Sequence, residues 1–200
     1  MESTKTRILK KLLETDGYLS GQELCEQLGV SRTAVWKYMK QLKEEGYEIE
    51  AVQNKGYCLK DVPDVLGESE IKSRLHTRWA GQTLYYYDEI DSTNTQIKRL
   101  AEEDAPHGTL AVADYQSRGK GRRGRAWDSP HGSAIYMSIL FRPEIRPDRA
   151  SMLTLVIGLS VTQAIRSNLG LQAQIKWPND VVLNGKKLVG ILTEMSAQMN

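Results

Sequence analysis

Residues 20–46 read S-G-Q-E-L-C-E-Q-L-G-V-S-R-T-A-V-W-K-Y-M-K-Q-L-K-E-E-G and decide the fold of the N-terminal part of the chain. Ser20 and Glu23 predict a capping box at the start of one helix, which Gly29 ends. Ser31 predicts the cap of a second helix, which runs to residue 45. Two helices joined by a short glycine turn are the arrangement of a helix-turn-helix unit.

The flanking segments extend this unit to a winged helix. Apolar residues at 8, 9, 12 and 13 recur at helical spacing and predict a helix before the pair. After the pair, residues 47–51 alternate between polar and apolar, residues 54–56 (Asn-Lys-Gly) are typical of a turn, and residues 57–59 alternate back. A two-stranded wing is therefore expected.

The helix that starts after Ser31 has the surface of a DNA-recognition helix. Val35, Met39 and Leu42 form its apolar stripe, so its polar and basic residues face outward. The alternative is a small helical domain whose basic face is solvated or binds protein. Residues 1–60 hold ten Lys and Arg against nine Asp and Glu, so affinity for DNA would require a dimer or a second contact surface. The predicted DNA-binding residues are Ser31, Arg32, Thr33, Trp36, Lys37, Lys40 and Lys55.

Composition sets broad limits on the class of protein. The 200 residues suffice for a small and a medium domain, and 40% hydrophobic with 26% charged residues is typical of globular proteins. No apolar run approaches the ~20 residues that span a bilayer, and the polar N-terminus does not resemble a secretion signal. We therefore expect a cytoplasmic protein without a membrane segment. Cys25 and Cys58 are expected to be free thiols, and no metal-ligand spacing is found.

Residues 61–67 contain Pro and Gly with little periodicity and predict a domain boundary, which gives domains 1–62 and 63–200. Beyond the boundary, helices and strands alternate. The sequence predicts an α+β domain with a mixed sheet. The expected helices are 70–75, 94–103 and 151–167, and the expected strands are 84–90, 110–115, 133–141 and 174–177, followed by a hairpin that turns at 184–185.

Residues 117–130, S-R-G-K-G-R-R-G-R-A-W-D-S-P, combine three glycines with five cations. The glycines fit G-x-G-x-x-G but lead into no helix, so this is not a dinucleotide-binding fingerprint, and no phosphate-binding P-loop string occurs. Guanidinium groups match phosphate and carboxylate oxygens, so we expect a loop that is mobile when empty and ordered by an anionic ligand. The alternative is a solvated surface loop or a second nucleic-acid contact. The cations are Arg118, Lys120, Arg122, Arg123 and Arg125.

The segment 176–180, K-W-P-N-D, and the lysines at 186 and 187 lie on the two arms of the expected hairpin. Taken singly, a Trp before Pro indicates packing and a Lys indicates surface. Both segments would nevertheless bring polar groups to one end of a sheet.

Taken together these motifs resemble one family. A winged helix, D-S-T-N at 91–94, G-K-G-R-R-G-R-x-W at 119–127, and K-W-P-N-D-V-V-L-N-G-K-K-L-V-G-I-L-T-E at 176–194 resemble the bacterial biotin protein ligases that also repress the biotin operon. The resemblance covers essentially the whole chain. It implies a mixed-sheet, class II synthetase-like catalytic domain behind the DNA-binding domain.

The resemblance also implies a two-step reaction and its residues. Biotin and ATP give biotinyl-5′-AMP and pyrophosphate, and a lysine of a carboxylase carrier domain then takes the biotin and releases AMP. Arg122 and Lys187 are the implied catalytic cations, and Asp180 either deprotonates the incoming lysine or has a structural role. The residues that match the family's ligand contacts are Ser92, Thr93, Asn94, Gln116, Lys120, Gly121, Arg122, Trp127 and Lys187.

Cofactors and partners follow from the same resemblance. Mg²⁺ is expected with ATP, without a protein metal site, and biotin serves both as substrate and as corepressor precursor. The expected partners are the biotin carboxyl carrier domain of acetyl-CoA carboxylase or a related enzyme, operator DNA, and a second copy of the chain on ligand binding. The alternative is a DNA-binding regulator that senses biotin or biotinyl-AMP without turnover.

Two features depart from the family pattern. The sequence ends after residues 194–200, where family members continue with a G-x-G-x-N strand, further helix and a small β-barrel, so we expect an exposed sheet edge and a partly open core. Arg118 stands where a small residue is common in the family, and we expect it to add mobility to the loop.

Overall fold

The computed structural model describes residues 3–196, which form two compact units. The first unit comprises the chain up to Ser117 together with Ser129–Phe141, and the second comprises Arg118–Asp128 and the chain from Arg142 onward. The last four residues of the segment 194–200, discussed above, lie outside the described residues.

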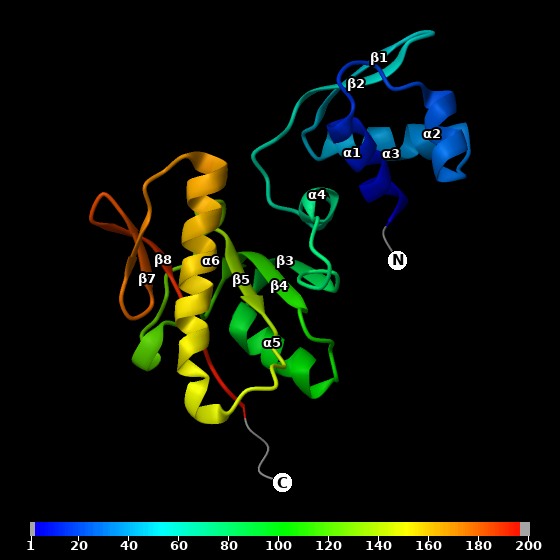
Figure 1. Ribbon diagram of the computed structural model, residues 1–200. Coiled ribbons are helices and arrows are strands. Elements are labelled where there is room, and N and C mark those ends of the chain that lie inside the picture. The colour runs from blue at the N-terminus through cyan, green and yellow to red at the C-terminus, as the bar shows by residue number, and fades with distance from the viewer. Residues whose placement is uncertain (1–2, 197–200) are drawn as a thin grey trace. The chain divides into compact units, whose positions relative to one another are not determined.

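The first unit begins with the winged helix that the sequence predicts. Three helices are followed by an antiparallel hairpin that extends from them (Figure 1). Asn54 and Gly56 turn this hairpin with positive φ angles of 65° and 110°. The elements are α1 (Thr4–Glu14), α2 (Gly21–Leu28), α3 (Arg32–Glu44), β1 (Glu48–Val52) and β2 (Gly56–Asp61).

Side-chain caps fix where these helices start. The Ser31 hydroxyl accepts from the Ala34 backbone N–H at 3.2 Å, as predicted for α3. The Ser20 hydroxyl accepts from the Gln22 N–H at 3.2 Å. The Glu23 half of the predicted capping box is wrong, because the Glu23 carboxylate accepts from the Gln27 side chain at 2.9 Å, one turn further along α2.

The core of the winged helix is built from the apolar stripes of its helices. Val35, Met39 and Leu42 of α3 are at most 2% exposed, as the predicted stripe requires. They pack with Ile8, Leu9, Leu12, Leu24 and Leu28 from the other helices, and Tyr47 and Ile49 close the cluster from the wing side.

Helix α4 (Glu68–Arg74) follows the predicted boundary segment and packs against α1. The Tyr47 hydroxyl donates to the Glu70 carboxylate at 2.6 Å. Burial and this hydrogen bond raise the pKa of the Tyr47 phenol above its usual range.

A mixed three-stranded sheet completes the first unit. β3 (Leu84–Ile90) pairs in parallel with β4 (Leu110–Gln116), and β4 pairs antiparallel with β5 (Tyr136–Ile139). Helix α5 (Thr93–Glu102) connects β3 to β4 and packs its Ile97 and Leu100 against Ala111. β5 is shorter than the predicted strand 133–141. Its first predicted residues form a turn, in which the Ser133 and Tyr136 hydroxyls both donate to the Pro130 carbonyl.

The second unit consists of the cation-rich segment, a short 3₁₀ turn η2 (Pro147–Arg149), a long helix and an antiparallel sheet. Helix α6 (Ser151–Leu169) places Ile157, Val161 and Ile165 against a small core of Ala173, Val181 and Ile191. The sheet has the order β6 (Gln174–Lys176), β7 (Asp180–Leu183), β8 (Lys186–Gly190), and Asn184-Gly185 turn the predicted hairpin with positive φ. The predicted α+β class is confirmed, with its strands divided between two sheets.

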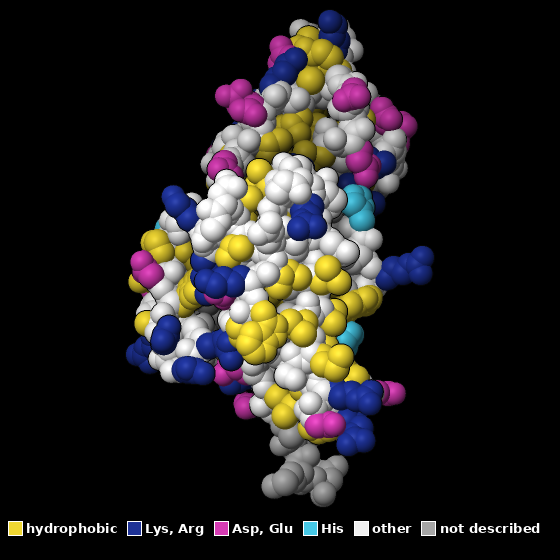
Figure 2. Space-filling view, turned by 60° about the vertical axis from the view of Figure 1, so that its left-hand side comes forward, with side chains coloured by type: hydrophobic (Ala, Val, Ile, Leu, Met, Phe, Trp, Pro, Cys, Tyr) yellow, Lys and Arg dark blue, Asp and Glu magenta, His cyan; other side chains and the backbone are white. Residues whose placement is uncertain are grey.

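Helix α6 leaves much apolar surface uncovered. Met152, Val156 and Leu159 are each at least 50% exposed, and hydrophobic side chains reach the surface at several places on the face drawn in Figure 2. By length and composition alone, residues 147–169 are also sufficient to cross a membrane, which the sequence analysis did not anticipate. The stripe that packs on Val181 is equally typical of a core helix.

Replacing Gly56 by Ala is predicted to unfold the wing. Gly56 has φ +110°, and a Cβ there would lie 2.1 Å from the Leu19 carbonyl oxygen, which accepts from the Tyr57 N–H. Because this contact is with backbone, we expect a loss of about 3 kcal/mol or more in the free energy of unfolding. Urea unfolding followed by circular dichroism measures it. The matched control is Gly67→Ala, where no atom lies within 4 Å, and equal losses in both variants would contradict the analysis.

Candidate functional site

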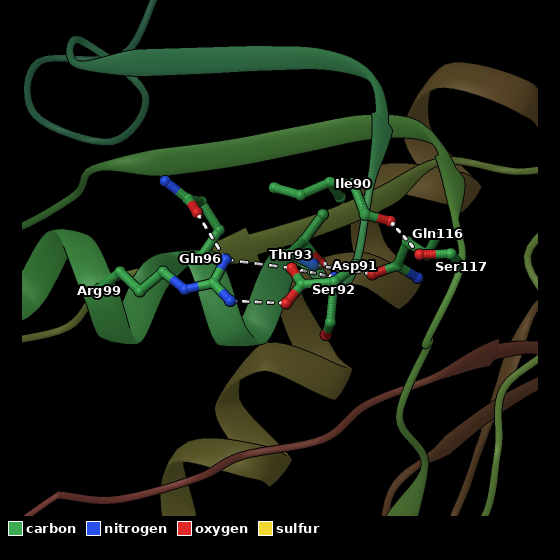
Figure 3. Close-up of polar contacts among 8 residues, drawn as sticks. All are labelled: Ile90, Asp91, Ser92, Thr93, Gln96, Arg99, Gln116 and Ser117. Atoms are coloured by element: carbon green, nitrogen blue, oxygen red, sulfur yellow. Dashed lines mark hydrogen bonds and ion pairs between the residues drawn. The ribbon is translucent and has the colours of Figure 1, made fainter.

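A cluster of buried uncharged polar side chains lies at the carboxyl ends of β3 and β4 (Figure 3). Ile90 is paired with Gln116, so the residues that follow β3 start α5 beside the end of β4. The Thr93 backbone N–H donates to the Gln116 side-chain oxygen at 2.9 Å, and the Thr93 hydroxyl donates to the same oxygen at 3.1 Å. Ser92, Thr93 and Gln116 are at most 9% exposed.

Two serines complete this polar cluster. Gln116 donates from its amide nitrogen to the Ser129 hydroxyl at 3.0 Å. The Ser138 hydroxyl lies 2.8 Å from the Thr93 hydroxyl and donates to the Asn94 side-chain oxygen. The sequence analysis predicted Ser92, Thr93, Asn94 and Gln116 and missed Ser129 and Ser138. The small residue Ser138 on β5 offers no sequence signal beyond alternation.

The hydroxyl protons of this cluster are fewer than its contacts. Thr93 and Ser138 together form three hydroxyl contacts, to Gln116, to Asn94 and to each other, but they carry one hydroxyl proton each. With the amides oriented as they are, one contact lacks a proton. The cluster therefore has spare acceptor capacity and suits a ligand that brings N–H donors.

Asp91 fixes the junction between β3 and α5. Its carboxylate accepts from the Ser92 N–H at 2.7 Å and pairs with Arg99 of α5 at 2.7 Å (Figure 3). On the other side, the Ser117 N–H donates to the Ile90 carbonyl at 2.9 Å. The backbone around Thr93 is thus held from both sides, which preorganises the cluster.

The cation-rich segment of the second unit is a short hairpin-like loop. Lys120 and Ala126 form an antiparallel bridge, the Gly121 N–H donates to the Arg125 carbonyl at 2.7 Å, and the Trp127 N–H donates to the Gly119 carbonyl at 2.9 Å. Its tip is the 3₁₀ turn η1 (Arg122–Gly124).

Asn179 links the tip of this loop to the β7–β8 hairpin. The Arg122 guanidinium donates to the Asn179 side-chain oxygen at 2.9 Å. The Asn179 amide nitrogen donates to the Ile191 carbonyl at 3.1 Å, and the Ile191 N–H donates to the Asn179 carbonyl at 2.9 Å. Turning the Asn179 side chain away from Arg122 would therefore break its hydrogen bond to the Ile191 carbonyl. The sequence analysis quoted Asn179 within K-W-P-N-D but gave it no role.

Lys187, Asp180 and Trp127 form a second contact group in the same unit. The Lys187 ammonium lies 2.7 Å from an Asp180 carboxylate oxygen and 4.9 Å from the centroid of the Trp127 ring. Gly190 faces Asp180 across the hairpin. A Cβ at Gly190 would lie 2.8 Å from Trp127 and 3.0 Å from Lys187, so the lack of a side chain there lets the indole and the lysine stem pack against the strand.

The predicted ligand residues thus fall into two sets. Ser92, Thr93, Asn94 and Gln116 come together in the first unit. Arg122, Trp127, Asp180 and Lys187 lie in the second unit, with Lys120 and Gly121 in the backbone of its loop. Among the residues that the structure describes, no group of three or more His, Cys, Asp or Glu is suited to a metal ion.

The predicted DNA-binding face is formed by α3 and the wing. Trp36 is 60% exposed, and Arg32, Lys37 and Lys40 are exposed beside it. A hollow of about 430 Å³ lies between the starts of α2 and α3 and the wing residues 51–57, with Lys55 on its rim.

The base of the wing is held by a charged cluster. Tyr18 donates to Glu50 at 2.6 Å, and Glu50 pairs with Lys60 at 2.9 Å. The Tyr18 hydrogen bond and the Lys60 ammonium hold the pKa of the Glu50 carboxyl below its usual value. Lys55 and Lys60 each lie 5.5 Å from the centroid of the Tyr18 ring.

Comparison with known proteins extends these observations. Residues 4–58 match the model of an HTH domain. The chain is 48% identical over 200 residues to the "Bifunctional ligase/repressor BirA" of Bacillus spizizenii, which covers 99% of this chain and 62% of that relative. It is 36% identical over 188 residues to the protein of the same name from Escherichia coli, covering 94% of this chain and 57% of that relative.

A solved structure shows the same similarity. "Biotin protein ligase from Aquifex aeolicus in complex with biotin and ATP" is similar with a TM-score of 0.51 and 39% identity, over 57% of this chain and 47% of that chain. The present chain spans about three fifths of the length of its curated relatives. Residues 86–199, more than half of the chain, match the model described as "Biotin/lipoate A/B protein ligase family", and the chain therefore belongs to the biotin/lipoate A/B protein ligase family.

Proposed function

We propose that this chain takes part in ATP-dependent biotinylation of a carrier protein. In the first step a biotin carboxylate oxygen attacks the α-phosphorus of ATP, an acyl–phosphate bond forms, and pyrophosphate leaves. In the second step a lysine amine of the carrier attacks the acyl carbon and AMP leaves. The observation that carries this proposal is the group of cations in the second unit, in which Arg122 is held by Asn179 and Lys187 by Asp180. Fixed cations stabilise the charge that develops on a reacting phosphate.

The buried polar cluster of the first unit is assigned to the uncharged end of biotin. A ureido ring offers two N–H donors and one carbonyl acceptor, and the spare acceptor capacity around Thr93 and Ser138 suits the donors. Ser92 and Asn94 belong to the same assignment. Burial of the cluster makes unpaired polar atoms costly, so a ligand that lacks these donors is rejected.

The loop and hairpin of the second unit are assigned to the carboxylate and phosphate end. Arg122 and Lys120 supply the side-chain donors of a phosphate clamp. Gly121, whose N–H donates to the Arg125 carbonyl, fixes the loop backbone between them. Lys187 serves the reacting carboxylate and phosphate, and Trp127 lines its stem. The ion pair with Asp180 supports a positioning role for Asp180 toward Lys187, beside the proposed role as base for the incoming lysine.

Mg²⁺ belongs to the proposal through the nucleotide. Within residues 3–196 the protein offers no cluster of carboxylates suited to the ion, so the ion would be bound chiefly by the ATP phosphates, whose charge it neutralises.

A second proposed function is biotin-responsive repression. The exposed face of α3, with Arg32, Lys37 and Trp36, favours operator binding. Ligand-induced pairing of two copies would place two such helices on a palindromic operator, with biotinyl-AMP as the corepressor. For the ligase reaction, the protein substrate would be a carrier domain of acetyl-CoA carboxylase or a related enzyme. The proposed compartment for both functions is the cytoplasm.

The first test of the ligase proposal is biotin-dependent exchange of labelled pyrophosphate into ATP. We expect exchange by the 200-residue chain, because both proposed contact sets lie within its described residues. No exchange from a chain that is folded by circular dichroism would favour the alternative, a regulator that senses biotin or its adenylate without turnover.

Arg122→Ala is predicted to lower the exchange rate about 100-fold or more, since loss of one fixed donor to a developing charge has this order of effect. The matched control is Arg118→Ala, which removes the same charge from the same loop. If both variants lose exchange equally, the loop acts through total charge and the specific role of Arg122 is wrong.

Lys37→Ala is predicted to weaken DNA binding without changing pyrophosphate exchange. Loss of one phosphate contact should reduce the slope of log affinity against log salt by about 1. Fluorescence anisotropy with a labelled duplex at several salt concentrations measures the slope. Arg149→Ala, which removes an exposed charge from η2, serves as the control. An unchanged slope in Lys37→Ala would exclude a phosphate contact by Lys37.

A further inference from the structure

We propose that Gln22, which lies outside the α3 recognition helix, is a positioning residue that makes Arg32 select a guanine in the DNA. The inference rests on the proposed DNA-binding function and names the base that is read and the side chain that orients the reader.

The geometry of the Arg32 guanidinium carries the inference. Its Nε and Nη2 nitrogens both donate to the Gln22 side-chain oxygen, at 3.3 and 2.8 Å. These two N–H groups form the lateral edge of the guanidinium. A planar guanidinium has five N–H donors in a fixed fork, so occupying the lateral edge leaves the terminal pair on Nη1 and Nη2 available.

Gln22 is itself held in the orientation that this contact needs. Its amide nitrogen donates to the Glu26 carboxylate at 2.7 Å, which directs the amide oxygen toward Arg32. Its backbone N–H donates to the Ser20 hydroxyl at the start of α2. The Gln22 amide is therefore fixed at both its ends, and it limits the directions in which the Arg32 fork points.

The surroundings are those of a surface that meets DNA. Gln22 and Arg32 both line the hollow of about 430 Å³ that the wing closes on its other side, and Arg32 is the first residue of α3. The N-terminal residues of a recognition helix are those that reach base edges in the major groove.

The terminal edge of an arginine matches one base edge in particular. Guanine presents two acceptors, O6 and N7, side by side in the major groove, and a bidentate arginine is the commonest specific contact with them. An arginine whose lateral edge is free has several competing orientations. When Gln22 binds that edge, the arginine keeps the orientation in which its terminal N–H pair faces guanine. Gln22 therefore adds specificity without touching the base.

The experiment selects duplexes from a library that carries a random segment, using the full chain and three variants, each with biotin, ATP and Mg²⁺ present so that the proposed corepressor can form. The bound DNA is then sequenced. For the wild type we expect one position per recovered half-site with a strong guanine preference. Arg32→Ala should abolish that preference. Gln22→Met, which keeps the size but loses the acceptor, should reduce it about tenfold at that position only, the order of one bidentate pair. Gln22→Glu, which keeps an acceptor for Arg32 but loses the donor to Glu26, should retain more of the preference than Gln22→Met.

A chemical control tests the two acceptors directly. In the recovered duplex, 7-deazaguanine at the selected position removes N7 and leaves O6. Anisotropy titrations should show a loss of affinity on this replacement for the wild type and no loss for Arg32→Ala. Thermal unfolding of Gln22→Met should match the wild type, because Gln22 is exposed.

The outcomes separate this inference from the proposed function. If Gln22→Met recovers sites with the same guanine preference as the wild type, the proposed role of Gln22 is wrong. The proposed DNA-binding function is not affected by that result. If sites are enriched but no position shows a guanine preference that Arg32→Ala removes, the assignment of guanine to Arg32 is wrong. If the folded chain retains no duplex at all, the proposed DNA-binding function fails and the inference fails with it.

Discussion

The parallel pairing of β3 with β4 is the constraint on which the buried polar cluster depends. Because Ile90 lies opposite Gln116, both strands end at the same edge of the sheet, and the chain after β3 starts α5 within reach of the Gln116 side chain. Asp91 then fixes that start through the Ser92 N–H and Arg99. The carboxyl end of parallel strands is a general place for ligands in such sheets, since loops and helix starts converge there.

The second unit relies on strand register in a different way. Asp180 and Gly190 face each other across β7 and β8, and Lys187 reaches back toward Asp180 while Trp127 lies over the bare Gly190 backbone. A slip of one residue would move Lys187 to the other face of the hairpin. The Asn179–Ile191 backbone pairing fixes the end of the hairpin and supplies the acceptor for Arg122. One register therefore orients both cations.

Local signals allowed most helices and strands to be predicted. Ser31, the Asn54–Gly56 turn and the α3 stripe each act over a few residues, and the structure confirms them. Longer-range features were not predictable in this way. The roles of Ser138 and Asn179 arise from hydrogen bonds to partners that lie 44 and 57 residues away in the sequence. The division of strands β3 to β8 into two sheets likewise depends on which strands pair. The candidate ligand residues were proposed from motifs. Which of these residues contact one another could be seen only from the fold.

The shortage of hydroxyl protons around Thr93 and Ser138 has a chemical consequence for selectivity. In the proposed assignment, the N–H groups of a ureido ring would donate to these hydroxyl oxygens. A cyclic carbonate or thiocarbonate of the same shape would present lone pairs to the lone pairs of buried oxygens. To relieve this repulsion the hydroxyls would have to give up their hydrogen bonds to Gln116 or Asn94. If the proposed assignment holds, the cluster would discriminate between molecules of equal shape by the heteroatoms in their rings.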